Sequence, residues 1–564
     1  MTLTALHVAR FKAFADSQCI PIRPITLIFG ANSAGKSSII HALALAHHAL
    51  ETGELDVQRT QIGGESIDLG GFRQYVHRHE RERRVELVME LDPQRLQGRI
   101  AQLMRPARQL ALELSIGAGF TSEQPTLFGD TWREVDRDLA VRVEAFSLRA
   151  DDQVLLAMSA RRDGLLRLDR LEHEHPVLRQ VFAGLLALST TAQELRAEDF
   201  EALGRVIDEL VPELSARVQG LFPRLLEPMP AGEAEEAPAF LPVSRGRRGE
   251  DLARAARLFF PRTLRELLGG VADAAEAEIR RLQYLGPLRS YPPRHLAFSQ
   301  HHDLNWFAGG GYAWDVVRQR PDVRDRINEW LGSVSRLKSP YELVVRELVA
   351  LDQLQNPIES ALEALAEEGL DIEPEYDDEP VPSGAVPVVR DPEAEVARFV
   401  ETIAASDADR VTELILRDLR TRTVVSHRDV GIGVSQVLPV LVAAYASRER
   451  LVAIEQPEIH LHPALQAELG DVFLESALGP ASNTFLLETH SEHLILRILR
   501  RIRETTDNEL PEGAPAVRPE QVAVLYVQPG RDGAEVVHIP VTPDGEFERP
   551  WPDGFFAERA KELF

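Results

Sequence analysis

The sequence has little cysteine, a deficit of basic side chains and no long apolar run. Cys19 is the single cysteine among 564 residues, which excludes an intrachain disulfide and a thiolate metal cluster and favours a reducing compartment. The 63 basic residues are outnumbered by 89 acidic ones, and the formal charge of -26 disfavours nonspecific attraction of the whole surface to nucleic acid or anionic lipid. This balance leaves room only for local basic patches.

The chain also lacks the sequence features of a membrane protein. No segment approaches the roughly 20 apolar residues that cross a bilayer, and the N-terminal "MTLTALHVARFKAF" lacks the apolar stretch of a signal peptide. We therefore expect a cytoplasmic protein with no membrane contact. A hydrophobic content of 44% in a chain of this length predicts a globular protein with a large core and two or more lobes.

Both ends of the chain contain short apolar runs that predict buried strands. "PITLIFG" (24–30) reads as a strand that ends at a glycine, and the helix predicted over 36–50 is apolar on most faces, which indicates a central position. Later in the chain, further strands are predicted over 451–454 and 483–489, with a hairpin over 521–541 that turns at Asp532 and Gly533.

The middle of the chain predicts a mixed insertion. Residues 84–170 contain several β-like runs, whereas 176–285 follow a largely helical pattern. A further helix is predicted over 395–419. Two interruptions rich in proline, glycine and acid, at 227–240 and 367–387, are typical of mobile surface loops, and the second should be dispensable for folding.

The strongest motif is "GANSAGKS" at residues 30–37, which fits G-x-x-x-x-G-K-[ST] between a predicted strand and a predicted helix. Its glycines allow backbone N–H groups to surround phosphates, Lys36 would reach the β- and γ-phosphates, and Ser37 would offer a hydroxyl to Mg²⁺. The alternative is a glycine-rich turn without a ligand. The residues expected to contact ATP are Gly30, Ala31, Asn32, Ser33, Ala34, Gly35, Lys36, Ser37 and Ser38.

Such a loop needs an acidic residue at the end of a neighbouring strand to help hold the metal. Glu455 ends the apolar run of "LVAIEQPEIHLHP" and suits this role together with Ser37. The alternative is an exposed glutamate near a helix N-terminus.

Five motifs occur in one order: "ARFKAF", "GANSAGKSS", "DVGIGVSQVLP", "IEQPEIHLHP" and "ETHSEHL". This order resembles ABC-type ATPase heads of the SMC, RecF and OLD kind. More closely, the chain resembles predicted bacterial AAA-family ATPases with a short C-terminal domain of unknown function that ends in a "WPDGFF"-like segment. The resemblance covers residues 1–90 and 280–564 and is weak in between.

The resemblance implies an α/β fold, a P-loop NTPase of the ABC-type head class with a mixed α+β insertion and a small C-terminal hairpin and helix extension. It divides the chain into five parts: 1–90 with the P-loop, 91–280 as the insertion, 281–400 as a lobe-coupling region with the acidic loop, 401–510 as the second half of the head, and 511–564 as the extension.

Individual residues are assigned by the same resemblance. Ser435 matches the signature serine at the start of a helix that faces the nucleotide of a second subunit, although "GVSQV" departs from the usual glycine-rich version. A hydrolase elbow is excluded because Val437 stands where G-x-S-x-G needs glycine. His490 matches the switch histidine that senses the γ-phosphate, with a structural histidine as the alternative. Lys12 matches a basic residue that such heads place near the nucleotide, and Arg289 lies near the expected position of the loop that couples the two lobes. Both are expected to contact the nucleotide, with solvated surface residues as the alternative.

The histidines of the "HLHP" segment, His460 and His462, are expected near a dimer interface. As a zinc pair they have no evident third and fourth ligands in the sequence, so no metal site is assigned to them.

Gln456 follows Glu455 where ABC-type heads normally place a second carboxylate that activates water. A glutamine can orient water but is no effective base at neutral pH. Either Glu458 takes over or hydrolysis is slow and the ATP-bound dimer is long-lived. We favour slow hydrolysis, because Glu458 is expected at a helix start, displaced from the strand end.

The resemblance implies a Mg²⁺-dependent ATPase that forms a homodimer or higher even oligomer around ATP and acts in anti-phage defence with a separate nuclease-like effector. The segment after residue 494 is too short for the nuclease domain of OLD proteins, and the absent heptads argue against a long coiled coil. DNA is an open partner through basic runs at 78–84, 245–248 and 497–503, which salt bridges explain equally well. The alternatives are a DNA repair or maintenance ATPase and a slowly hydrolysing scaffold or sensor.

Overall fold

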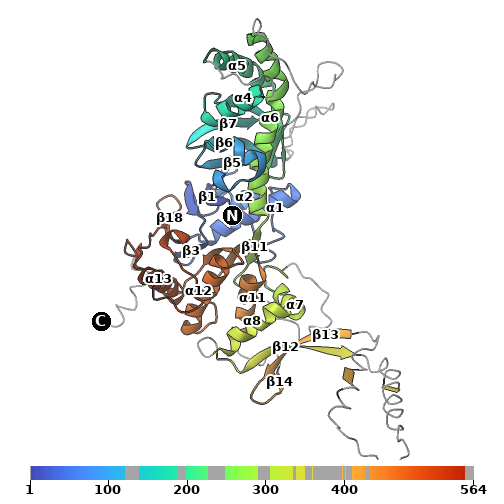
Figure 1. Ribbon diagram of the computed structural model, residues 1–564, viewed down its shortest axis with the longest axis vertical. Coiled ribbons are helices and arrows are strands. Elements are labelled where there is room, and N and C mark those ends of the chain that lie inside the picture. The colour runs from blue at the N-terminus through green and yellow to red at the C-terminus, as the bar shows by residue number, and fades with distance from the viewer. Residues whose placement is uncertain are drawn as a thin grey trace, which may run out of the picture. The chain divides into compact units, whose positions relative to one another are not determined.

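The computed structural model describes most of the chain in two compact units, drawn in Figure 1. The first unit comprises the described residues within 1–291, 302–313 and 432–564, and the second those within 314–431. The residues that the structure describes are 2–120, 139–187, 197–225, 248–289, 305–333, 338–349, 358–359, 397, 400–401, 410–425 and 432–552. The acidic segments 227–240 and 367–387, residues 245–247 and the segment after 552 lie outside them.

A largely parallel sheet forms the part of the first unit that joins the two ends of the chain. Its strands are almost completely buried, as expected for apolar strands covered on both faces. All neighbours pair in parallel except the last two, which form a hairpin. Among the described residues the strand order is β11 (Leu282–Leu285), β15 (Leu451–Glu455), β16 (Thr484–Glu488), β3 (Ile25–Gly30), β17 (Val522–Pro529) and β18 (Ala534–His538).

Helices connect these strands as in other α/β sheets. Helix α1 follows β3, α12 links β15 to β16, and α13 leads from β16 towards β17, so the parallel strands are joined by helical crossovers. The connecting helices are α1 (Ser37–Thr52), α11 (Ile432–Ala446), α12 (Pro463–Leu478) and α13 (Glu492–Asp507). The predicted strands, the predicted central helix and the C-terminal hairpin are thereby confirmed.

An antiparallel sheet forms the rest of the first unit. A continuous buried cluster joins it to α1, to the long helix α6 and to the parallel sheet. In Figure 1, α6 runs beside its strands. Among the described residues its order is β10 (Phe222–Leu225), β9 (Ser215–Gln219), β8 (Leu166–Leu171), β7 (Gln153–Ala160), β6 (Leu139–Ala150), β5 (Leu110–Phe120), β4 (Val85–Leu91), β1 (Leu3–Ala9) and β2 (Gln18–Pro21).

The first unit contains further helices. They are α2 (Phe72–Tyr75), α3 (Gly98–Leu103), α4 (Pro176–Ala187), α5 (Ala197–Leu210) and α6 (Arg248–Ile279), with the short 3-10 helices η1 (His77–His79), η2 (Pro93–Arg95), η3 (Val211–Glu213) and, near the C-terminus, η6 (Pro519–Gln521).

The β9–β10 hairpin lies inside the region predicted to be largely helical. Its strands are joined by a two-residue turn in which Gly220 has φ +62°, a conformation that favours glycine. The short strands bury Ala216, Phe222 and Leu225. The helical pattern of the flanking segments hid this hairpin, because two strands of four or five residues contribute little periodicity of their own.

In the second unit, the last third of the helix predicted over 395–419 forms a strand instead, so this part of the prediction is wrong. Residues Arg410–Asp418 form strand β13, which pairs in antiparallel register with β12 (Tyr341–Val349) and β14 (Val424–Val425). Leu414 and Leu416 are buried, so the burial follows the period of two of a strand. Helix α8 (Pro321–Gly332) belongs to this unit, and α7 (Tyr312–Gln319) precedes it along the chain.

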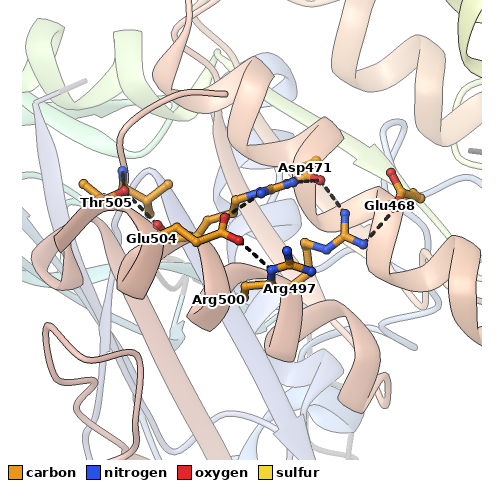
Figure 2. A network of polar contacts seen from close by, with 8 residues as sticks. Glu468, Asp471, Arg497, Arg500, Glu504 and Thr505 are labelled. Atoms are coloured by element: carbon orange, nitrogen blue, oxygen red, sulfur yellow. Dashed lines mark hydrogen bonds and ion pairs between the residues drawn. The ribbon is translucent and has the colours of Figure 1, made fainter. Parts of the chain in front are cut away.

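The basic run at 497–503 is largely occupied by internal ion pairs between α12 and α13, as Figure 2 shows. Asp471 receives two hydrogen bonds from Arg501, at 2.7 and 2.8 Å, and a further one from Arg497. Glu504 accepts from Arg501 at 2.6 Å. The salt-bridged interpretation of this run therefore applies to these arginines.

Three arginines of the basic run at 78–84 also lie near carboxylates. Arg84 lies 3.9 Å from Glu144, Arg83 pairs with Glu80, and Arg78 lies 3.5 Å from Asp532.

No helix in the described part of the chain is long and apolar enough to cross a membrane.

The turn of the C-terminal hairpin packs against the N-terminal segment. The backbone N–H of Ala534 donates to the carbonyl of Ala13 at 2.7 Å, and His77 Nε2 lies 3.1 Å from the carbonyl of Asp532. A side chain at Gly533 would place its Cβ 2.7 Å from the Ala13 oxygen. Glycine is therefore required there by close approach of two backbones.

We expect Gly533→Ala to destabilise the first unit by about 1–3 kcal/mol, the usual cost of overpacking. The measurement is thermal unfolding of the full chain by calorimetry. Gly332→Ala, where the added methyl meets nothing within 4 Å, serves as the control. Equal melting temperatures for both variants and the wild type would contradict the proposed close contact.

Candidate functional site

The loop at residues 30–36 connects β3 to α1 and has the backbone conformation of a phosphate-binding turn. Gly30 has φ +148°, Gly35 +102° and Ser33 +61°. A Cβ at Gly30 would lie 2.3 Å from the carbonyl oxygen of Val527 in β17, and one at Gly35 would lie 2.4 Å from Ala13 Cβ. Ala31, Asn32 and Ser33 are exposed, whereas Ala34 and Ser38 are buried. Packing and backbone geometry together therefore require the two glycines.

Lys36 is held across this loop by its own backbone. Its ammonium donates to the carbonyls of Gly30 and Ala31 at 3.1 and 2.9 Å and lies 4.0 Å from a carboxylate oxygen of Glu488. The side chain is 4% exposed, and burial lowers its pKa. A cation is thus positioned where the loop would surround phosphates.

Ser37, the first residue of α1, contacts a carboxylate that the sequence analysis did not single out. Its hydroxyl donates to Glu488 Oε2 at 2.8 Å. Glu488 ends β16 and pairs in register with Glu455 at the end of β15. A signal for Glu488 was present, because "TFLLE" repeats the pattern of "LVAIE", an apolar run that ends in glutamate.

Glu455 is buried at the end of β15 among residues from two other elements. The hydroxyl of Tyr284, in β11, donates to Glu455 Oε1 at 3.0 Å, and His41 Nε2 of α1 lies 3.9 Å from the same oxygen. Burial, and secondarily the charge of Glu488, raises the pKa of Glu455 to about 8. His41, one helical turn after Ser37, and Tyr284 were both missed, because neither lies in a recognised motif.

Lys12 lies in the same network. Its ammonium donates to His41 Nδ1 at 2.7 Å and to the carbonyl of Asp68 at 3.2 Å. Burial lowers the pKa of Lys12 to about 8 and that of His41 to about 3, so the imidazole is neutral and accepts this hydrogen bond. A cavity of about 550 Å³ opens beside Lys12, lined also by Asp68, Gln74 and His79.

Glu458 differs from the expectation of a helix start. It lies in the turn after β15, and α12 begins only at Pro463 because His462 caps that helix by accepting from the N–H of Ala464. Glu458 Oε2 accepts from the hydroxyl of Thr489, and Oε1 from the backbone N–H of His490, both at 2.7 Å. Both oxygens thus organise the turn after β16.

The backbone around Gln456 is tied to neighbouring elements by Arg289. Gln456 has φ +47°, and its N–H donates to the carbonyl of Glu488 at 2.7 Å. The buried Arg289 guanidinium donates to the carbonyls of Gln456, Glu455 and Gln436 at 3.0, 3.2 and 3.1 Å. Burial lowers the pKa of Arg289 to about 10. Arg289 therefore joins the end of β15 to α11.

Two further predicted residues lie at the start of α11 and directly after β16. Ser435 lies in the first turn of α11 and is 1% exposed. His490 is half-buried, and burial lowers its pKa. Within the described residues no group of three His, Cys, Asp or Glu side chains is arranged to hold a metal ion by itself.

The oxygen donors at the sheet edge nevertheless fit Mg²⁺ together with a nucleotide. Mg²⁺ in nucleotide sites is held by one or two carboxylates and by phosphate oxygens. The Ser37 hydroxyl and the Glu488 and Glu455 carboxylates lie beside the loop and would hold the ion, which when bound neutralises phosphate charge.

Two protein-family models match parts of this chain. Residues 247–497 match the family described as "AAA domain, putative AbiEii toxin, Type IV TA system". Residues 517–564 match "Protein of unknown function (DUF3696)". A search of curated proteins found no significant match.

The solved structures that a structural comparison matches to this chain include heads of SMC proteins. An SMC head bound to the C-winged helix domain of ScpA has 9% sequence identity and a TM-score of 0.33. The match covers 96% of this chain and 98% of the SMC chain. A Pyrococcus furiosus SMC head with an extended coiled coil, bound to the C-terminal domain of ScpA, has 10% identity and a TM-score of 0.33, covering 100% and 98%. The Thermotoga maritima SMC head domain has 8% identity and a TM-score of 0.31, covering 96% and 100%.

TM-scores of this size carry no weight by themselves, so the assignment rests on the P-loop, the parallel sheet behind it and the matched AAA domain. The chain thus has a P-loop NTPase fold of the ABC type, with a match to an AAA domain over residues 247–497 and to DUF3696 over residues 517–564.

Proposed function

We propose that this chain binds Mg²⁺ and ATP at residues 30–38, dimerises around the nucleotide and uses the nucleotide state to switch engagement of an effector protein in anti-phage defence. The observation that carries the proposal is the convergence of Lys36, Ser37, Glu455 and Glu488 at one sheet edge. The description of the matched family names a putative toxin of a type IV toxin–antitoxin system, which supports a defence role over DNA repair or maintenance.

A protein effector is favoured over DNA as the direct partner. Arg497, Arg501 and Arg78 form ion pairs with carboxylates of this chain. DNA binding needs lysines and arginines that neutralise phosphates. Paired arginines at 78–84 and 497–503 support an effector that provides any nuclease activity itself.

Slow hydrolysis is favoured by the surroundings of Gln456. Glutamine cannot act as a general base, and both carboxylate oxygens of Glu458 accept hydrogen bonds that hold the turn after β16. A slow ATPase with a long-lived ATP-bound dimer suits a switch that waits for a trigger.

Replacing Lys36 by Ala should abolish measurable ATP binding, since removal of one partner of a buried charge pair costs at least about 2 kcal/mol, or roughly 30-fold in affinity. Isothermal titration calorimetry with a non-hydrolysable ATP analogue measures the effect. The exposed Lys338→Ala removes the same charge in the second unit and is the control. Unchanged affinity in Lys36→Ala would refute the P-loop interpretation.

Steady-state hydrolysis should be weak in the wild type and should fall by about 100-fold in Glu455→Ala, because a carboxylate that would help to hold Mg²⁺ against the charge of the transition state is lost. Gln456→Glu should hydrolyse ATP as fast as the wild type or faster, by up to about 100-fold, because it adds a general base. Fast wild-type turnover that collapses only in Glu458→Gln would make Glu458 the base and overturn our preference.

Removing the hydroxyl with Ser435→Ala should spare ATP binding by the monomer and weaken ATP-dependent dimerisation, because the signature serine is expected to reach the nucleotide of the second subunit. The small replacement is chosen because Ser435 is buried, and a bulky one would disturb α11. Light scattering after gel filtration, with and without the ATP analogue, reports the mass. Ser476→Ala, which removes another buried hydroxyl, is the control. Normal dimerisation of Ser435→Ala would contradict the two-headed arrangement.

A further inference from the structure

Glu488 has a position at the P-loop that no motif assigns. It lies at the carboxyl end of β16, between the end of β15 on one side and β3, which leads into the loop, on the other. The side chain is buried, with 5% of the residue exposed. One carboxylate oxygen accepts from the Ser37 hydroxyl, and the other lies 4.0 Å from the Lys36 ammonium.

The distance between Ser37 and Glu488 matches that of two neighbouring ligands of one Mg²⁺ ion. Mg²⁺ demands octahedral geometry with oxygens at about 2.0–2.1 Å, so two adjacent ligand oxygens lie about 2.9 Å apart. Ser37 Oγ and Glu488 Oε2 are 2.8 Å apart. The two oxygens can therefore bind one ion with little movement of either element.

Glu455 is held differently. Its Oε1 accepts from the Tyr284 hydroxyl, on the side of β11, and lies near His41 of α1. Because Glu455 and Glu488 are in register on adjacent parallel strands, their Cα atoms are separated by roughly the 4.8 Å spacing of a sheet. Glu455 can thus support the same ion from the next strand, while Glu488 has the direct contact with Ser37.

The charges at this edge also call for a cation. Two buried carboxylates on adjacent strands repel one another when ionised and would repel the phosphates of ATP. Of the nearby cations, Lys36 lies at 4.0 Å from Glu488 and already donates to two loop carbonyls. A divalent ion between carboxylates and phosphates turns both repulsions into attractions.

We propose that Glu488 is a direct ligand of the magnesium ion that accompanies the nucleotide, adjacent to Ser37, with Glu455 in support. This role rests on the proposed ATP site. Since the described residues contain no group of three side chains able to hold a metal alone, the ion binds only together with the phosphate oxygens. Nucleotide and metal are therefore taken up as one unit, and neither binds tightly without the other.

The test measures metal binding directly, with Mn²⁺ as the probe for Mg²⁺ and electron paramagnetic resonance to count free Mn²⁺ in the presence and absence of a non-hydrolysable ATP analogue. The wild type should bind one Mn²⁺ tightly only with the analogue. Glu488→Gln keeps the shape of the side chain and removes its charge, and should weaken Mn²⁺ binding to the protein-bound analogue by at least about tenfold. Glu488→Asp keeps the carboxylate one methylene farther from Ser37 and should give an intermediate affinity.

Glu504→Gln is the matched control, because it neutralises a buried carboxylate in the α13 ion pairs, and it should bind Mn²⁺ like the wild type. The proposal is overturned if Glu488→Gln and Glu488→Asp bind Mn²⁺ like the wild type. It is also overturned if Glu488→Gln binds the analogue more tightly without metal and equally well with it, since Glu488 would then only repel phosphate. A wild type that binds no analogue at all overturns the proposed function as well, which separates the two failures.

Discussion

Parallel pairing of β15, β16 and β3 is the constraint on which the whole site depends. In parallel strands all carboxyl ends meet at one edge of the sheet. The register sets Glu455 opposite Glu488 and Glu488 opposite Ile28, two residues before the P-loop begins at Gly30. Two carboxylates that are 33 residues apart in the chain thus lie beside a loop more than 400 residues earlier. A slip of one residue in either strand would turn a glutamate to the opposite face of the sheet.

The edge gathers three buried carboxylates beside the cations of Lys12, Lys36 and Arg289. Glu455, Glu458 and Glu488 are all buried there, and burial raises the pKa of each. Burying an unpaired carboxylate costs several kcal/mol. Glu458 is compensated by hydrogen bonds from the turn after β16, and Arg289 is committed to backbone carbonyls. The arrangement around the other two glutamates is consistent with a site adapted to a divalent cation and phosphates.

The DUF3696 segment is part of this architecture. Its strand β17 pairs with β3 along the whole length of that strand, and the Val527 carbonyl approaches Gly30 so closely that only glycine fits. The Trp551 ring packs edge-on against Phe29, with centroids 5.1 Å apart. The C-terminal segment therefore packs directly against the P-loop, and a structural change in this segment would act on the loop through these contacts.

The sequence by itself determined the P-loop, the buried strands around it and the C-terminal hairpin, because each of these is encoded locally by apolar runs, glycines and turn residues. It also singled out Glu455, since a carboxylate at the end of an apolar run is visible without a fold. Only the tertiary structure decided that Glu488 contacts Ser37, that Tyr284 and His41 surround Glu455 and that Glu458 holds the turn after β16. These contacts join strands and helices distant in sequence, and strand pairing, which local patterns do not specify, brings them together. Strand β13 was also decided by tertiary structure, because its residues suit a helix locally and form a strand through pairing with β12.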